Sequence, residues 1–379
     1  MMVRYAYCPT TKERDRIASS PGNAEWHYQG DFTSPMPAQW GGCLHYYNTM
    51  ICQFLCLYAE NRITPDRIFC QISDHPALLR YTFPENISWE KKMILDARVR
   101  PPFKSLRDVL APAPGARPSV KRSPLVSGYE RPQSMVHKSV ELFLQEMDEA
   151  GVDKGILVGR QAGHRVVSND DIAELRDQYP GRFPLALAGI NGINVPAAVR
   201  EVERTITNMG FNGIAVDPGW WVPPMYVDDP RIYPVYAKCA ELGGVLYLTC
   251  SLMQGPDISY AEPWRIQRVA NDFPELQIVV VHGAFPYTSE MLGVMIANAP
   301  LGNLWVVPDF FQFIPGFPGA RDWVEAANHF LGDRILYASS YPVRPLKQSL
   351  EEFRRFSYRP DVLENLTGKN AANLFGIRI

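Results

Sequence analysis

Two arginines and one histidine are the residues of this sequence best suited to chemistry on a small anion. Arg98 and Arg100 alternate in the segment Asp96-Ala97-Arg98-Val99-Arg100, so an extended strand would present both guanidinium groups on one face with Asp96. Two such groups form a strong site for a carboxylate or another planar anion. His282 joins them because an imidazole transfers protons near neutral pH. The alternative is that the arginines form ion pairs that only stabilise the fold.

Further polar and aromatic residues follow the predicted strands at their carboxyl ends. We expect His282 and Asp217 to carry catalysis, with Asp217, or Asp309 in its place, orienting the histidine or acting as a base. Aromatic rings there would form apolar walls around a few polar groups, as in small-molecule sites. Besides the two arginines, the predicted substrate-binding residues are Arg160, Thr249, Asp309, Ser340, Tyr341 and Trp220. His164 is a weaker candidate near the same position.

The elements that must hold these residues follow from an alternation of short apolar segments and amphipathic stretches after Met93. Eight such pairs in roughly 290 residues predict an α/β fold, a (β/α)8 TIM barrel, rather than a doubly wound sheet. The predicted strands are Ile94–Val99, Lys154–Val158, Pro184–Ala188, Gly213–Asp217, Val245–Thr249, Gln277–His282, Leu304–Pro308 and Arg334–Ala338. The predicted helices are Ser139–Ala150, Asp170–Tyr179, Pro196–Met209, Pro230–Leu242, Pro263–Asp272, Ser289–Asn298, Arg321–Leu331, Leu346–Arg355 and Pro360–Phe375. In such a barrel the carboxyl ends of the strands carry the active site.

Residues 1–92 differ in character from the barrel predicted for residues 93–379. The segment Trp89-Glu90-Lys91-Lys92-Met93 must be encoded as UGG-GAR-AAR-AAR-AUG, where R is a purine, and this resembles a bacterial ribosome-binding site ahead of a start codon. One hypothesis is therefore that residues 1–92 are a wrongly assigned upstream extension. The other is that they form a genuine but irregular N-terminal extension.

Composition and charge exclude several classes of function. The 379 residues carry a formal net charge of −2, which argues against a partner of strong charge such as a nucleic acid or an acidic membrane. The most apolar early stretch, 44–58, is too short to span a membrane, and no secretory signal follows Met1, so we expect a cytoplasmic protein. No glycine-rich dinucleotide or nucleotide loop is present. The long proline-rich loop 101–133 suggests a lid or a subunit contact, which leaves a homo-oligomer open.

Ordered segments from Met93 to Ile379 resemble the amidohydrolase-related branch of the amidohydrolase superfamily. That resemblance implies a distorted TIM barrel and a metal-dependent hydrolase or decarboxylase. Each segment is weakly specific, but the set in this order is fairly specific. The matching segments are 94–96, 182–183, 209–214, 228–231, 241–243, 273–276, 281–283, 339–342 and 368–372.

The departures from the family pattern are as informative as the matches. The family's His-x-His pair falls on Arg98 and Arg100, and its strand-five histidine falls on Thr249, or on Leu248 if the register shifts by one residue. The strand-eight aspartate position falls on Ser340, so that only the strand-six histidine remains, as His282. Guanidinium groups stay protonated and cannot coordinate a metal. We therefore expect neither metal nor cofactor, with the arginines supplying the positive charge instead.

These observations predict an enzyme that acts on a small anionic substrate, carboxylated or a lactone. The resemblance implies hydrolysis, isomerisation or decarboxylation, and some lactone-processing relatives work without metal. In this interpretation Arg98 and Arg100 bind the carboxylate or polarise a carbonyl while His282 transfers the proton. The rival hypothesis is a barrel that has lost catalysis and serves as a binding or scaffold protein.

Overall fold

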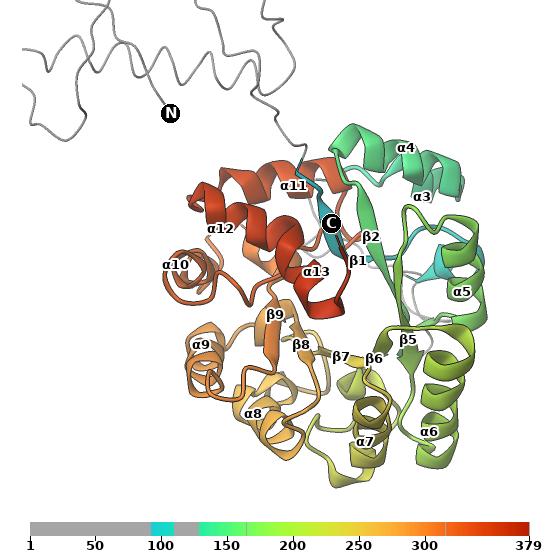
Figure 1. Cartoon of the computed structure of the whole chain (residues 1–379), viewed down its shortest axis with the longest axis vertical. Coiled ribbons are helices and arrows are strands. Elements are labelled where there is room, and N and C mark those ends of the chain that lie inside the picture. Colours follow the sequence, from blue (N-terminus) through green and yellow to red (C-terminus); the bar gives the residue numbers. More distant parts are fainter. Residues whose placement is uncertain (1–91, 110–128, 164, 315, 379) are drawn as a thin grey trace, which may run out of the picture. The chain divides into compact units, whose positions relative to one another are not determined.

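The structure is a computed structural model that describes residues 92–109, 129–163, 165–314 and 316–378 (Figure 1). The hypotheses on residues 1–92 therefore concern, apart from Lys92, residues outside this set. His164 and residues 110–128 of the predicted long loop lie outside it as well. No helix in the described ranges is both long enough and apolar enough to cross a membrane.

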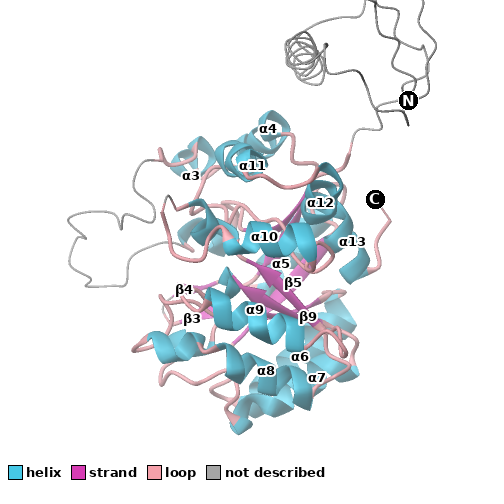
Figure 2. Cartoon of the chain, turned by 90° about the vertical axis from the view of Figure 1, so that its left-hand side faces the viewer, coloured by secondary structure: helices cyan, strands magenta, loops and turns pink. Residues whose placement is uncertain are grey.

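Seven parallel strands form a curved sheet in the order β1-β2-β5-β6-β7-β8-β9. Helices surround this sheet on its outer side, as expected for a TIM barrel (Figures 1 and 2). Each strand is a short buried run, and seven of the eight predicted strands are present within one or two residues of the expected bounds. The strands are β1 Leu95–Val99, β2 Lys154–Val158, β5 Leu185–Ile190, β6 Gly213–Val216, β7 Val245–Thr249, β8 Ile278–Val281 and β9 Leu304–Val307.

The eighth predicted strand, Arg334–Ala338, closes the barrel without forming a regular strand. A single parallel bridge joins Val306 to Ile335, and the backbone N–H of Ala97 in β1 donates to the carbonyl of Tyr337 at 2.9 Å. The backbone N–H of Tyr337 donates outside the sheet, to the carbonyl of Leu366 at 2.9 Å. This outward bond breaks the ladder, so the prediction of a regular strand is wrong although the segment lies where a strand was expected.

Helices follow the strands in the predicted order, and several begin after a polar cap. Ser139, Ser168 and Asn194 each accept a hydrogen bond from a backbone N–H in the first turn of the helix that follows. The helices that follow the sheet order are α4 Val140–Ala150, α5 Asn169–Gln178, α6 Val195–Glu203, α7 Tyr233–Glu241, α8 Pro263–Asp272, α9 Thr288–Ala297, α10 Asp322–His329 and α11 Leu346–Arg355. A short helix, α3 Gln133–His137, and a hairpin of β3 Gln161–Ala162 with β4 Arg165–Val166 were not predicted.

Two predicted helices are interrupted by a π-helical turn. The turn η4 (Arg204–Asn208) follows α6, and η10 (Asn365–Lys369) separates α12 (Pro360–Glu364) from α13 (Asn370–Phe375). Each turn contains a threonine whose hydroxyl donates to the carbonyl four residues earlier, Thr205 to Glu201 at 2.7 Å and Thr367 to Leu363 at 2.8 Å. Such bonds compete with the backbone ladder and locally distort a helix.

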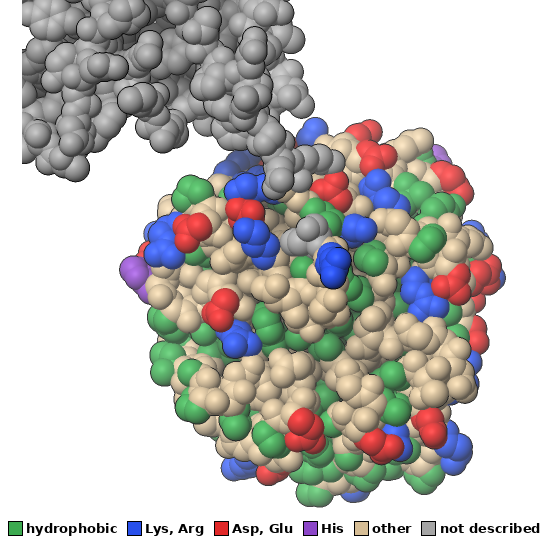
Figure 3. All heavy atoms as spheres, viewed as in Figure 1, with side chains coloured by type: hydrophobic (Ala, Val, Ile, Leu, Met, Phe, Trp, Pro, Cys, Tyr) green, Lys and Arg blue, Asp and Glu red, His purple; other side chains and the backbone are tan. Residues whose placement is uncertain are grey.

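The alternation of buried residues separates two apolar cores. Leu95, Val158, Leu187, Tyr247 and Val281 belong to a cluster inside the barrel, whereas their sequence neighbours pack outward against the helices. Helix α13 contributes Ala371 to the inner cluster. On the outer surface visible in Figure 3, acidic and basic side chains are interspersed, in keeping with the near-zero net charge. Because apolar side chains fill the interior of the barrel, we look for polar site residues at the carboxyl ends of the strands.

Candidate active site

A bulge in β1 sets the direction of the two arginines. Asp96 pairs with Gly155 and Val99 pairs with Leu157, so three steps along β1 match two steps along β2. Before the bulge Ala97 packs inside the barrel, and after it Val99 packs outside. The prediction that Asp96 shares one face with Arg98 and Arg100 by strict alternation is therefore wrong.

Arg98, Asp309 and His282 form a buried chain at the mouth of the barrel. Arg98 Nη1 donates to Asp309 Oδ2 at 3.1 Å, and His282 Nδ1 lies 2.9 Å from Asp309 Oδ1. Arg98 Nη1 also lies 3.3 Å from the hydroxyl of Ser340. These contacts join β1 to the ends of β8, β9 and the eighth segment. The sequence predicted all four residues, and the structure brings them together.

Three of these residues have a left-handed backbone conformation that residues other than glycine rarely adopt. The φ angles are 71° for His282, 46° for Asp309 and 60° for Ser340. Each residue lies at the carboxyl end of a strand or of the eighth segment. Strain of this kind costs of the order of 1–3 kcal/mol per residue and clusters at functional sites.

The surroundings of His282 favour its neutral form. Burial lowers the pKa of His282 below its ordinary value, and the charge of Asp309 opposes that effect while the charge of Arg98 adds to it. The rings of Phe310 and Phe311 meet the imidazole edge-on, with centroids 5.3 and 5.4 Å away. A carboxylate can only accept, so Nδ1 carries the proton and Nε2 carries the free lone pair. The site thus contains an oriented base.

Asp217 does not contact His282. Its carboxylate accepts from Gln254 Nε2 at 3.4 Å, and the orienting position belongs to Asp309. Strand order explains this, because Asp309 follows β9, the neighbour of β8, whereas β7 lies between β8 and β6. The expectation that Asp217 orients His282 is corrected accordingly. Thr249 is buried at the end of β7.

Arg100 is bound to backbone rather than to an acidic side chain. Its Nε donates to the carbonyl of Val158 at 2.8 Å and its Nη2 to the carbonyl of Gly159 at 3.2 Å. Burial lowers its pKa, and the nearby charges of Arg98 and Arg160 lower it further. Arg100 therefore caps the end of β2 and adds positive charge to the mouth.

Arg160 lies against an indole ring. Its guanidinium carbon is 4.1 Å from the ring centroid of Trp220, and that of Arg165 is 5.3 Å from the same ring. Trp220 is fixed by a hydrogen bond from its Nε1 to the carbonyl of Met253 at 2.6 Å. The structure brings together these two residues, which were both predicted to bind substrate. Arg165 was missed, although it follows the same strand and could have been found there.

Tyr341 points away from the mouth. Its hydroxyl is hydrogen-bonded to Ser134, and its ring packs on Phe143 with a centroid distance of 4.6 Å in the outer core. The left-handed turn at Ser340 leaves Ser340 in the mouth and sends the next side chain outward. The structure does not bring Tyr341 to the predicted site.

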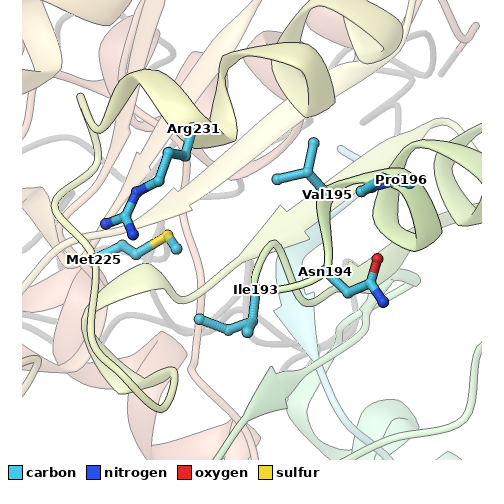
Figure 4. A pocket seen from close by; sticks show the side chains of 6 residues that line it. All are labelled: Ile193, Asn194, Val195, Pro196, Met225 and Arg231. Atoms are coloured by element: carbon cyan, nitrogen blue, oxygen red, sulfur yellow. The ribbon is translucent and has the colours of Figure 1, made fainter.

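Two surface pockets of the described ranges lie apart from the mouth. One of them, of about 530 Å³, lies between the loop after β5 and the segment before α7, and it is lined by Ile193, Asn194, Val195, Pro196, Met225 and Arg231. Figure 4 shows Met225 and Arg231 on one side and Asn194, Val195 and Pro196 on the other. The mouth residues themselves are largely buried, and His282 keeps 7% of its surface exposed.

The family of the chain is decided by a match of residues 115–377 to the amidohydrolase family model. The chain belongs to the amidohydrolase family. It is similar to 2-amino-3-carboxymuconate-6-semialdehyde decarboxylase of Dictyostelium discoideum, with 27% identity over 55% of this chain and 65% of that protein, so it spans less than two thirds of that relative. It is also 24% identical to gamma-resorcylate decarboxylase of Rhizobium radiobacter, over 59% of this chain and 77% of that protein.

Among solved structures, this amidohydrolase is similar to an uncharacterized TIM-barrel protein from Bordetella bronchiseptica. The identity is 34%, the TM-score is 0.67, and the match covers 75% of this chain and 98% of the other. The predicted family and barrel fold are thus confirmed.

The residues of this amidohydrolase do not fit the divalent metal that the family resemblance implies. Within the described ranges, no group of three or more histidine, cysteine, aspartate or glutamate side chains could hold a metal ion. At the mouth, one carboxylate oxygen of Asp309 is hydrogen-bonded to His282 Nδ1, and the other accepts a hydrogen bond from Arg98. The buried guanidinium groups nearby would repel a cation. The mouth instead has the charge of an anion site.

Proposed function

We propose that this amidohydrolase is an enzyme that decarboxylates a small hydroxylated carboxylic acid without a metal ion. The observation that carries the proposal is the chain from His282 through Asp309 to Arg98, which joins an oriented base to a fixed positive charge. The names of two sequence relatives support decarboxylation over the other two predicted reactions. Arg160, buried and stacked on Trp220, supports an anionic substrate.

The proposed reaction uses His282 as a proton carrier. Its Nε2 takes the proton of a substrate hydroxyl, and Arg98 stabilises the resulting oxyanion. The protonated imidazole then gives that proton to the carbon that bears the carboxylate. The carbon–carbon bond breaks, its electron pair stays with the substrate carbon, and carbon dioxide leaves. Solvent finally protonates the product oxyanion, so that one proton is consumed for each carbon dioxide released.

Hydrolysis of a lactone or ester is the second candidate. The neutral imidazole of His282 favours it, because Nε2 could equally take a proton from water as the water attacks a carbonyl group. Arg98 would then stabilise the developing oxyanion. The predicted alternative of a scaffold protein is less favoured, because a lapsed site has no need to maintain the strained backbone at His282, Asp309 and Ser340.

The proposal is tested by carbon dioxide release from a panel of hydroxybenzoates and related hydroxy acids, with lactones assayed in parallel by proton release. His282→Gln should lower turnover by about 10²–10⁴-fold, as loss of a general acid or base does. His329→Gln, which changes an exposed histidine of α10, is the matched control and should leave turnover unchanged. Release of carbon dioxide that is equal in both variants would remove His282 from the reaction.

A further inference from the structure

Two arginines beside the mouth have guanidinium groups without hydrogen-bond partners among the described residues. Arg160 and Arg165 make no side-chain hydrogen bond or ion pair in the part of the chain that the structure describes. The Nε atoms of both are buried and unsatisfied. Leaving a buried charged donor without an acceptor costs free energy, which a bound acceptor would recover. Arg98 and Arg100 differ from these two, because each makes at least one side-chain hydrogen bond.

The two guanidinium groups flank a single aromatic ring. Both lie within 5.3 Å of the centroid of Trp220, Arg160 from the loop after β2 and Arg165 from β4. A hydrogen bond from Trp220 Nε1 to the carbonyl of Met253 at 2.6 Å anchors the ring to the loop after β7. The next residue, Trp221, donates from its Nε1 to the carbonyl of Gln161 in β3 at 2.9 Å. Arg160 is only 5% exposed and Arg165 is partly buried. Arg160 is therefore packed against the ring before any ligand binds, and Arg165 lies beside the same ring.

The charges around this pair do not balance. Asp217 is the carboxylate whose charge raises the pKa of both arginines, against the effect of burial, which lowers that of Arg160 to about 10. Asp309 is already paired with Arg98. One carboxylate therefore faces two unpaired guanidinium groups. A planar anion with two acceptor oxygens would supply both the missing charge and the missing acceptors.

We propose that Arg160 and Arg165 bind a second carboxylate of the substrate, so that this amidohydrolase acts on small dicarboxylates. The reacting group then lies at Arg98 and His282, and the other carboxylate is held against the edge of Trp220 by the arginine pair. This inference rests on the proposed function, because it names the class of compound that the same mouth accepts. Charged hydrogen bonds of this kind contribute enough for about a tenfold or greater difference in affinity.

Binding of isophthalate and benzoate, measured by titration calorimetry on the full chain, tests this without any need for turnover. We expect isophthalate to bind about tenfold more tightly than benzoate. Arg165→Gln should abolish that difference while benzoate affinity stays within about twofold, and Arg165→Lys should retain part of it because it keeps the charge but loses the planar fork. Arg355→Gln, which removes the same charge from the exposed end of α11, is the control and should preserve the wild-type preference.

The outcomes separate this inference from the proposed function. Equal affinity of the two probes, no measurable binding of either, or an equal loss of both in Arg165→Gln would overturn the dicarboxylate site. If the enzyme decarboxylates monocarboxylates but does not prefer isophthalate to benzoate, the proposed function is retained and the dicarboxylate site is rejected. A preference for isophthalate that depends on Arg165, in a protein that releases no carbon dioxide, would support the site and count against the proposed reaction. Unfolding temperatures of all variants identify any loss of affinity that comes from misfolding.

Discussion

Asp309 Oδ1 lies 2.9 Å from Nδ1 of His282, and this contact fixes which nitrogen of the imidazole is available for chemistry. The other carboxylate oxygen accepts from Arg98, so one aspartate holds a base and a cation in a fixed relation. All three side chains are buried. The relation between these groups is the basis of the proposed reaction and of most of the predictions below.

The rate of carbon dioxide release should fall on the acid side with a midpoint below the ordinary histidine pKa of 6.5, and this fall is the acid limb of the pH profile. Burial and the charge of Arg98 lower the pKa of His282, so its basic form persists to more acidic pH than in an exposed histidine. Asp309→Asn removes a charge that raises this pKa, so the limb should move further toward acid while kcat falls. Rates of carbon dioxide release from pH 4 to 9 check both effects. A limb at or above 6.5, or one that Asp309→Asn moves toward alkaline pH, would contradict the assignment.

Arg98→Met should destabilise the fold as well as abolish activity. The substitution leaves the buried carboxylate of Asp309 without its cation, which typically costs about 3–5 kcal/mol in the free energy of unfolding. The double variant Arg98→Met with Asp309→Asn should recover part of that loss, because the uncompensated charge is gone. Urea unfolding of the single and double variants measures this. If the losses of unfolding free energy in the two single variants simply add up in the double variant, the ion pair contributes nothing to stability.

Asp96 should make the stability depend on pH. Burial raises its pKa from 3.8 to about 7, although its carboxylate accepts from the backbone N–H groups of Arg98 and Ser339. The folded state thus holds a proton that the unfolded state loses above about pH 4, so this group's contribution to stability falls as the pH rises from about 4 to 7 and is constant above that. A pKa difference of about three units corresponds to about 4 kcal/mol at most.

The variant Asp96→Asn cannot titrate and should flatten this dependence. Free energies of unfolding for the wild type and the variant, measured between pH 4 and 8, provide the comparison. Equal slopes in the two proteins would show that Asp96 is charged at neutral pH in the folded state.

The barrel and most of the mouth could be predicted from the sequence because they follow from local patterns. Apolar runs, helix caps such as Ser139 and the rule that strand ends carry the site were enough to select Arg98, Arg160, His282, Asp309 and Ser340. Strand order within a barrel would also have favoured Asp309 over Asp217 as the partner of His282, since neighbouring strands bring their ends together.

The errors arose where one segment depends on a distant one. The bulge that separates Asp96 from Arg98 appears only in the pairing of β1 with β2. The eighth strand fails because Tyr337 donates to Leu366 rather than along the sheet. Tyr341 is directed outward by the turn at Ser340 and is held there by Ser134, which is about 200 residues away in the sequence. No local pattern reports such contacts.

In the proposed reaction, fixed guanidinium groups rather than a bound cation supply the positive charge at the mouth of this barrel. The most direct measurement is the rate of carbon dioxide release by protein that has been exhaustively chelated and whose metal content is then determined by elemental analysis. We expect full activity with less than about 0.1 metal ion per chain, and no gain when zinc or manganese is added back. Activity that disappears on chelation and returns in proportion to added metal would contradict it.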